Sequence, residues 1–297
     1  MIIMEALAWA STQLKPVCEP LHTSPLLEAE ILLSEALRTP KAHLIAHMES
    51  EVDPSALACF QNWVTRRLQH EPVAYLIGKK EFYGRTFLVN PSVLIPRPAT
   101  ETLIDGALEI ARTMSADHDL VADIGTGSGA IAITMALESG MSVIATDISK
   151  EALDLAQENA RRLGAEASVR FLEGDLLDPL LALWKSSSES LPQHLLLCAN
   201  LPYLSHAQWE TTMSDVRDFE PEHALVCELD GLGAYWKMFL EIKQQRRWFP
   251  KRLSIVCEHD PSQTIPLRDI VLHTFPDAQV CVTKDLEGFD RITEVGW

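Results

Sequence analysis

Apolar residues recur at helical spacing in the first quarter of the chain. Ser24 and Pro25 have the form of a helix start, with Ser24 as the cap and Pro25 at the first helical position. Asp53 and Pro54 repeat this signal and precede a second apolar face. The residues of that face are Leu57, Phe60, Val64 and Leu68. The pattern predicts a small helical bundle over residues 1–78.

Around Glu81 the pattern changes from helical spacing to alternation. The segment EFYGRTFLVN alternates aromatic or aliphatic residues with polar ones on both sides of Gly84. Such alternation about a glycine turn predicts a β-hairpin. We expect residues 79–97 to form a hairpin linker between the helical domain and a larger domain over residues 98–297.

From residue 98 onward, apolar strands alternate with helices. The predicted strands are DLVADIG, MSVIATD, SVRFLEGD, HLLLCAN and RLSIVCEH. A helix that ends at Gly140 follows the first strand, and a helix capped by Ser149 and closed by Gly164 follows the second. This order predicts an α/β fold with a doubly wound, mostly parallel sheet. The polar segment KSSSES, residues 185–190, is expected to be a surface loop without a function.

Composition limits the class of protein. The chain has 297 residues, of which 47% are hydrophobic, and this fits one large globular domain or a medium domain plus a small one. No apolar run approaches the roughly 20 residues of a membrane-spanning helix. The N-terminus has no basic residue before Lys15, unlike a secretory signal. We expect a cytoplasmic protein that is independent of membranes.

Charge and cysteine spacing narrow the partners further. The chain carries 25 basic and 42 acidic residues, a net charge of −17, which disfavours nucleic acid as the main partner without excluding it. No two of the six cysteines lie close enough to form a zinc-type pair, so we expect no metal and buried free thiols. These cysteines are Cys18, Cys59, Cys198, Cys227, Cys257 and Cys281.

A glycine-rich loop follows the first predicted strand of the larger domain. Asp123 leads into Gly125-Thr126-Gly127-Ser128-Gly129, where the backbone can turn sharply and a ligand can approach it closely. The next strand ends at Asp147, whose carboxylate can accept hydrogen bonds from both hydroxyls of a ribose. A dehydrogenase would have the spacing GxGxxG, whereas GxGxG fits S-adenosylmethionine better. A glycine-rich turn by itself often binds no ligand, so the prediction of a nucleoside-type ligand depends largely on Asp147.

The third strand of the larger domain ends near another acidic residue. Asp175, with Leu176 after it, lies where a carboxylate could reach the amine of an adenine ring. The alternative is that Asp175 is an ordinary polar residue of a loop. We include Asp175, Leu176 and also Asn200, after the fourth strand, among the predicted cofactor-binding residues.

The strongest feature is Asn200-Leu201-Pro202-Tyr203 at the end of the fourth strand. The Asn200 side-chain oxygen and the Leu201 carbonyl could each accept one hydrogen of a planar NH2 group. Pro202 would stiffen the turn, and Tyr203 would stack on the plane of that group. Holding both hydrogens would aim the nitrogen lone pair at a sulfonium methyl group, which is catalysis by positioning. The alternative is a strand-ending turn with a buried tyrosine.

The chain resembles the peptide chain release factor glutamine methyltransferases over nearly its whole length. The most specific shared motifs are EFYG and IPRP. The resemblance runs through Glu71-Pro72, Tyr75-Leu76-x-Gly78, Glu81-Phe82-Tyr83-Gly84, Val93-Leu94-Ile95-Pro96-Arg97-Pro98-x-Thr100-Glu101, the glycine loop, Asp147-Ile148-Ser149, the tetrapeptide, Phe219-Glu220-Pro221, Ala224-Leu225, Asp230-Gly231, Glu258, Gln263, Asp285-Leu286 and Asp290-Arg291.

This resemblance implies a seven-stranded methyltransferase sheet with a small N-terminal helical domain that docks the substrate. It implies methylation of the glutamine amide in the Gly-Gly-Gln motif of release factors, with S-adenosylmethionine as methyl donor. It also implies that Pro96-Arg97-Pro98 lines the cleft between the domains, where Arg97 would serve structure or substrate binding. We expect a monomer.

Two other classes of function stay open. The family usually has proline where this chain has Leu201, and NLPY is also the form seen in ribosomal RNA adenine dimethyltransferases. An adenine amine of nucleic acid is therefore the alternative target, although the base would have to be flipped out and the net charge opposes it. A non-catalytic adaptor is the other class, but Asp147, Asn200 and Tyr203 are all present.

Overall fold

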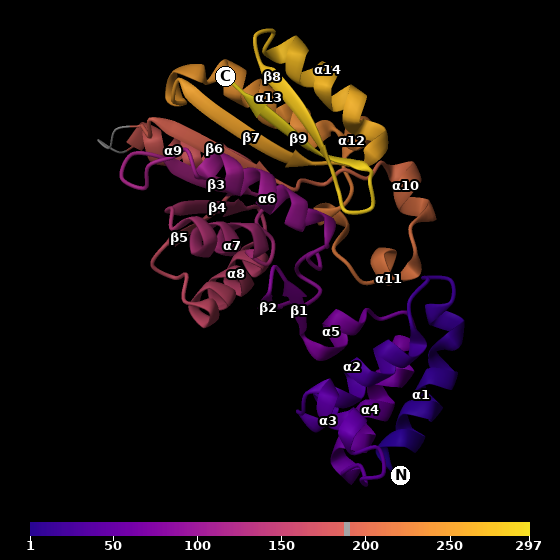
Figure 1. Ribbon diagram of the computed structural model, residues 1–297. Helices are drawn as coiled ribbons and strands as arrows, with labels where there is room; N and C mark the ends of the chain where they lie inside the picture. The colour runs from indigo at the N-terminus through magenta and orange to yellow at the C-terminus, as the bar shows by residue number, and fades with distance from the viewer. Residues whose placement is uncertain (187–190) are drawn as a thin grey trace. The chain divides into compact units, whose positions relative to one another are not determined.

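The computed structural model describes residues 1–186 and 191–297 (Figure 1). These residues form two compact units. The first contains Met1–Lys79 together with Met213–Phe219, and the second contains Lys80–Thr212 and Glu220–Trp297. Of the polar loop expected at residues 185–190, the first two residues end a helix and the other four lie outside the described residues.

The first unit is a bundle of helices. They are α1 (Ile3–Cys18), α2 (Pro25–Leu37), α3 (Lys41–Ala46), α4 (Pro54–Arg67), α5 (Val73–Ile77) and the short α11 (Ser214–Arg217). Ser24 caps α2 by accepting the Leu27 N–H, and Asp53 caps α4. Phe60 of α4 is fully buried, but Leu68 is 37% exposed. Leu68 was predicted to share the apolar face, and this was wrong because α4 ends at Arg67, one residue earlier.

A buried arginine joins α11 to the helices of the first unit. The Arg67 side chain is 2% exposed, and its guanidinium pairs with Glu28 of α2 and Asp215 of α11, each at 2.7 Å. His70 Nδ1 also lies 3.1 Å from the Asp215 carboxylate. A buried guanidinium needs such partners, because an unpaired charge inside a protein is strongly unfavourable. These contacts explain why residues 213–219 belong to this unit although they follow the fourth parallel strand in sequence.

The second unit is built on a seven-stranded sheet with the order β5-β4-β3-β6-β7-β9-β8. Its strands are β3 (Leu120–Ile124), β4 (Val143–Asp147), β5 (Val169–Glu173), β6 (His194–Ala199), β7 (Arg252–Glu258), β8 (Gln279–Lys284) and β9 (Asp290–Gly296). The pairs from β5 to β7 are parallel, and β9 pairs antiparallel with both β7 and β8. The predicted mostly parallel, seven-stranded sheet is confirmed.

Helices cover both faces of this sheet (Figure 1). They are α6 (Ala99–Ala111), α7 (Ala130–Ser139) and α8 (Lys150–Leu163) on one face, and α9 (Asp178–Ser186), α13 (Gly233–Gln244) and α14 (Thr264–Thr274) on the other. The unit also contains the short helices α10 (His206–Thr211) and α12 (Glu228–Gly231) and the 3-10 turns η1 (Glu222–Ala224), η2 (Arg246–Trp248) and η3 (Pro261–Gln263). Strand β6 is buried throughout: Leu196 packs with α6 and α7, whereas Leu195 and Leu197 pack with α9 and α13. Apolar side chains on both faces are typical of a central parallel strand.

A two-stranded hairpin lies beside the glycine loop. Strands β1 (Lys79–Phe82) and β2 (Arg85–Leu88) are joined by Tyr83 and Gly84, which both have positive φ, as a two-residue hairpin turn requires. The Asn159 side chain of α8 bonds the N–H and C=O of Leu88 and also donates to the Ser128 carbonyl at 2.9 Å. This buried amide therefore fixes the end of the hairpin against the loop.

Two further predictions from the sequence concern membranes and cysteines. Within residues 1–186 and 191–297, no helix has the length and apolar character that crossing a bilayer requires. Cys18, Cys198 and Cys257 are buried, as expected, but Cys59 and Cys227 are only partly buried and Cys281 is exposed. Burial was the wrong expectation for Cys281 because it lies on β8, the edge strand of the sheet.

Candidate active site

A pocket of about 530 Å³ opens at the carboxyl ends of β3, β4 and β6. Parallel strands place their carboxyl ends at one edge of a sheet, so segments far apart in sequence meet there. The volume lies within the range of small-molecule sites. The described residues that line it include all five of the glycine loop, Arg97, Asp147, Asp175, Leu176, Asn200, Leu201 and Pro202.

The glycine loop is held in a turned conformation by its backbone and by Asp123. The N–H groups of Gly125 and Thr126 both donate to the Thr146 carbonyl at 2.9 Å. Gly127 has φ +53°, and apart from its own chain neighbours no described residue has an atom within 4 Å of the position that a Cβ would take. The loop therefore leaves space for a ligand to approach its backbone.

Asp123 connects the loop to the helix that follows it. One carboxylate oxygen accepts the Thr126 hydroxyl at 2.6 Å and the Ala132 N–H at 3.1 Å. The other oxygen is buried and has no hydrogen-bond partner among the described residues. Burial raises the pKa of the Asp123 carboxyl to about 7, against the opposing effect of its two donors.

Asp147 faces the pocket from the end of β4. Its Oδ2 accepts the Gly127 N–H at 2.8 Å, and its Oδ1 accepts the Ser149 N–H at 2.9 Å. A carboxylate oxygen has a second lone pair, so both oxygens keep the capacity to accept a ligand hydroxyl. The free lone pairs of the Asp147 carboxylate thus fit the hydroxyl donors of the ribose of S-adenosylmethionine.

Asp175 and Leu176 lie on the same side of the pocket. Asp175 forms an ion pair with Lys237 of α13, and both side chains are largely exposed. Leu176 has φ +46°, and its carbonyl accepts the Thr146 hydroxyl at 3.0 Å. The structure brings both predicted residues to the pocket and gives Asp175 a cationic partner that sequence spacing did not reveal.

Asn200 follows the last residue of β6. Its Nδ2 donates to the Thr100 hydroxyl oxygen at 3.2 Å. Its Oδ1 is buried and has no hydrogen-bond partner among the described residues. A buried carbonyl oxygen without a donor is unfavourable, so this atom is suited to accept an N–H from a ligand.

Tyr235, Gln263 and Gly231 surround the backbone of the rest of the tetrapeptide. The Leu201 N–H donates to the Tyr235 hydroxyl at 3.2 Å, and that hydroxyl also lies 3.1 Å from the Ala199 carbonyl. Gln263 Nε2 donates to the Tyr203 carbonyl at 2.7 Å. A Cβ on Gly231 would lie 1.9 Å from the same carbonyl oxygen, so only glycine fits there. The backbone of the motif is therefore fixed before any ligand binds.

Tyr203 occupies a different place from the other residues of the motif. Asn200, Leu201 and Pro202 line the pocket, but Tyr203 is not among the described residues that do so. Burial raises the pKa of its hydroxyl well above the usual value, and the Glu258 charge adds to this. Stacking of Tyr203 on a bound NH2 group stays a prediction.

Arg97 lines the pocket and also has a partner inside the second unit. Its guanidinium forms an ion pair with Glu220, whose side chain is only 1% exposed. The second Glu220 oxygen accepts the Ile95 N–H at 3.1 Å. Glu220 therefore holds the segment that carries Arg97.

Several site residues were not found by reasoning from sequence spacing. Tyr235 and Gln263 support the tetrapeptide, and Lys237 pairs with Asp175. Their positions depend on how α13 and η3 pack against β6, which no local pattern expresses. Gln263 was noted only as part of the family resemblance.

The fold and pocket define the class of protein. Residues 121–219 match a methyltransferase domain family. A crystal structure of the hMettl16 catalytic domain in complex with MAT2A 3′UTR hairpin 6 aligns with a TM-score of 0.53 over 82% of this chain and 81% of that chain. The N-terminal domain of human METTL16 in complex with SAH aligns with a TM-score of 0.51 over 72% and 76%. Both are 16% identical to this chain and show the fold alone. The second unit is an S-adenosylmethionine-dependent methyltransferase domain.

The family follows from the N-terminal residues and from full-length relatives. Residues 5–78 match the PrmC N-terminal domain. The release factor glutamine methyltransferase of Bacillus subtilis (strain 168) is 39% identical over 97% of this chain and 96% of its own length. Those of Bacillus anthracis and Staphylococcus aureus (strain NCTC 8325 / PS 47) are 36% and 34% identical, over 98% and 91% of both chains. The chain belongs to the release factor glutamine methyltransferase family.

Proposed function

We propose that this chain methylates the side-chain amide nitrogen of the glutamine in the Gly-Gly-Gln motif of peptide chain release factors. The observation that carries the proposal is that Asn200 lines the pocket and that its buried Oδ1 has no hydrogen-bond partner in the part of the chain that the structure describes. The names of the full-length relatives point to the same class of substrate.

The glycine loop and Asp147 would hold the methyl donor. S-Adenosylmethionine supplies an electrophilic methyl group on a sulfonium. Asp147 would accept the ribose hydroxyls with the lone pairs that Gly127 and Ser149 leave free. Asp175 and Leu176 would border the adenine, and Lys237 would keep the Asp175 carboxylate in place.

The tetrapeptide would hold the substrate amide. Asn200 Oδ1 would accept one amide N–H, and the Leu201 carbonyl would accept the other. With both hydrogens held, the amide nitrogen would direct its lone pair at the methyl group, and the rate would rise through positioning and preorganised dipoles. Pro202 would stiffen the turn, and Tyr203 would pack against the amide. The methylated nitrogen loses its proton readily, so no general base is required.

The remaining parts of the proposal concern the rest of the molecule. Residues 1–78 would dock the release factor, with residues 79–97 as linker and residues 98–297 as the catalytic part. Arg97, which lines the pocket, would contact the substrate while Glu220 holds it. The chain would act as a monomer in the cytoplasm.

The experiment is a transfer assay with labelled S-adenosylmethionine and three acceptors. These are an intact release factor, the same factor with its motif Gln→Ala, and an adenine-containing RNA that tests the alternative target. We expect label only in the unaltered factor. Label that persists in the Gln→Ala factor, or that enters the RNA instead, would overturn the proposal.

A further inference from the structure

Helix α12 contains two residues in an unfavourable backbone conformation. Leu229 has φ +54° and ψ +51°, and Asp230 has φ +52° and ψ +37°. In this left-handed region the Cβ of a residue comes too close to its own backbone, so such residues persist only where the surrounding structure holds them. Strained residues of this kind gather at ligand sites, and Leu229 lines the pocket.

The side chain of Leu229 is exposed at this pocket. Leu229 is 64% exposed, whereas the nearby Leu232 is 5% exposed and packs in the core. An exposed leucine alone is ordinary on a protein surface. Here a strained backbone holds the exposed side chain at a pocket, and this combination indicates contact with a ligand.

Backbone hydrogen bonds hold the chain before this turn against the end of the tetrapeptide. Leu204, which follows Tyr203 directly, donates its N–H to the Leu225 carbonyl at 2.8 Å. The Leu204 carbonyl accepts the Cys227 N–H at 2.9 Å. The chain that leads into the turn therefore runs beside the residue that follows the tetrapeptide.

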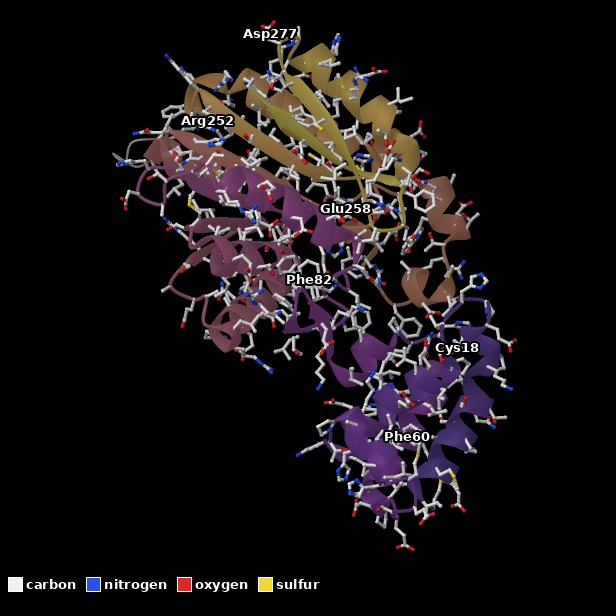
Figure 2. All side chains as sticks on the ribbon, viewed as in Figure 1. Cys18, Phe60, Phe82, Arg252, Glu258 and Asp277 are labelled. Atoms are coloured by element: carbon white, nitrogen blue, oxygen red, sulfur yellow. The ribbon has the colours of Figure 1, made fainter. Side chains whose placement is uncertain are left out.

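Gln263 holds the turn itself. Strand β7 ends at Glu258, labelled in Figure 2, and Gln263 follows it in η3. Gln263 Nε2 donates to the Tyr203 carbonyl at 2.7 Å and to the Asp230 carbonyl at 2.9 Å. Its Oε1 accepts the Asp260 N–H at 3.1 Å, and the residue is 4% exposed. One buried amide thus ties the left-handed turn to the backbone of the tetrapeptide.

We propose that Leu229 is a substrate-contact residue that packs against the methylene groups of the glutamine side chain. The inference rests on the proposed function, because it names the wall that receives the aliphatic part of that glutamine. The bonds of the turn to Tyr203 and Leu204 join it to the tetrapeptide, which holds the amide in the proposed function. The glycine loop and Asp147 follow β3 and β4 instead, and they hold the methyl donor.

A glutamine side chain needs two kinds of surface in its site. Asn200 and Leu201 accept the hydrogens of the amide, but these contacts do not recognise the methylene groups. Methylene groups leave water favourably where an apolar surface receives them. Leu229 offers such a surface, and its fixed backbone has little conformational freedom to lose when the substrate binds.

The test measures methyl transfer to an intact release factor and S-adenosylmethionine affinity for Leu229→Ala, Leu229→Met and Leu229→Gly. Leu229→Ala should lower kcat/KM for the factor by about tenfold to a hundredfold, because an apolar contact with the substrate is lost. Its affinity for S-adenosylmethionine should stay within about threefold of the parent value. Leu229→Met should restore most of kcat/KM, since methionine has a similar volume. Leu240→Ala is the matched control, because Leu240 is 38% exposed on α13 and is not among the described residues that line the pocket.

Leu229→Gly separates contact with the substrate from a structural role. Glycine adopts the left-handed conformation without strain, so this variant should melt no lower than the parent although it loses activity as Leu229→Ala does. Either variant with a kcat/KM within about threefold of the parent would overturn the inference. A loss of cofactor affinity as large as the loss of kcat/KM would also overturn it, because Leu229 would then contact the methyl donor.

The parent chain distinguishes failure of this inference from failure of the proposed function. A parent chain that methylates the factor, together with an equally active Leu229→Ala variant, would refute the inference alone. A parent chain that transfers no methyl group to the factor would refute the proposed function, and the inference with it.

Discussion

Asn200 Nδ2 lies 3.2 Å from the hydroxyl oxygen of Thr100, a residue 100 positions earlier in the chain. The contact joins the end of β6 to the first turn of α6. It engages the nitrogen of the amide and leaves the buried oxygen without a partner among the described residues. The residue thus presents an acceptor at the pocket, which is what recognition of an NH2 group requires.

Asp147→Ala should weaken cofactor binding by about 1–3 kcal/mol, because ligand hydroxyls would lose their acceptor in a partly buried site. The change also removes the acceptor of the Gly127 N–H, so the loop would be less ordered. Isothermal titration calorimetry with S-adenosylmethionine measures the effect. Asp154→Ala is the control, since Asp154 is exposed on α8 and pairs only with Lys150 among the described residues. An unchanged affinity in Asp147→Ala would remove this carboxylate from the site.

Because Asp123 is buried, the free energy of unfolding should fall as pH rises toward neutrality. Its pKa is about 7 in the folded chain and 3.8 ordinarily, so between these values the folded state binds more protons than the unfolded state. Wild-type stability should therefore decrease by on the order of 2 kcal/mol from pH 5 to 7.5 relative to Asp123→Asn. An Asn oxygen can still accept from Thr126 and Ala132.

Chemical denaturation at several pH values measures this difference, with the exposed Asp154→Asn as control. The wild type should lose stability relative to Asp123→Asn as pH rises. A constant difference between the two proteins across the range would contradict the account of Asp123.

Arg67→Ala should destabilise the first unit by about 3–5 kcal/mol, because it leaves the buried carboxylate of Glu28 and the partly buried carboxylate of Asp215 without their guanidinium. Arg66→Ala, next to it, should cost about 1 kcal/mol or less, because the Arg66 side chain is 42% exposed and pairs with Glu71 at the surface. Urea denaturation of the full chain measures the effect of each substitution on the free energy of unfolding. Hydrogen exchange in α2 and α4 then shows whether the loss lies in the first unit. Equal effects of the two changes would contradict the assignment of residues 213–219 to this unit.

A chain that lacks residues 1–78 should still bind S-adenosylmethionine. The described residues that line the pocket all lie between Ser92 and Lys237 in the second unit. The same chain should fail to methylate an intact release factor if the helical residues dock it. Calorimetry and the transfer assay measure the two properties separately. Methylation of the intact factor at the full rate would show that docking does not need these residues.

The sequence predicts the parts of the site that follow from strand order. The glycine loop, Asp147 and Asn200 each come directly after a strand, and parallel strands bring such positions to one edge of the sheet. The two-residue hairpin turn at Tyr83 and Gly84 follows from local alternation in the same way.

Other features depend on contacts between distant residues and carry no local signal. Arg67 and Asp215 are 148 positions apart, and contacts such as their ion pair, not the local sequence, place residues 213–219 with the helices. Tyr235 supports the tetrapeptide because α13 packs on the same face of the sheet as Leu201. The exposure of Leu68 depends on where α4 ends, and a helix boundary is less certain in sequence than the helix itself.

In the proposed mechanism, Asn200 accepts an N–H of the glutamine amide in the transition state. Single-turnover methyl transfer at saturating cofactor tests it most directly, because this measurement separates the transfer step from cofactor binding. Asn200→Ala removes the acceptor, and the account predicts a rate about a hundredfold to a thousandfold below that of the parent chain. The melting temperature should stay close to the parent value. A transfer rate within about threefold of the parent would contradict the account.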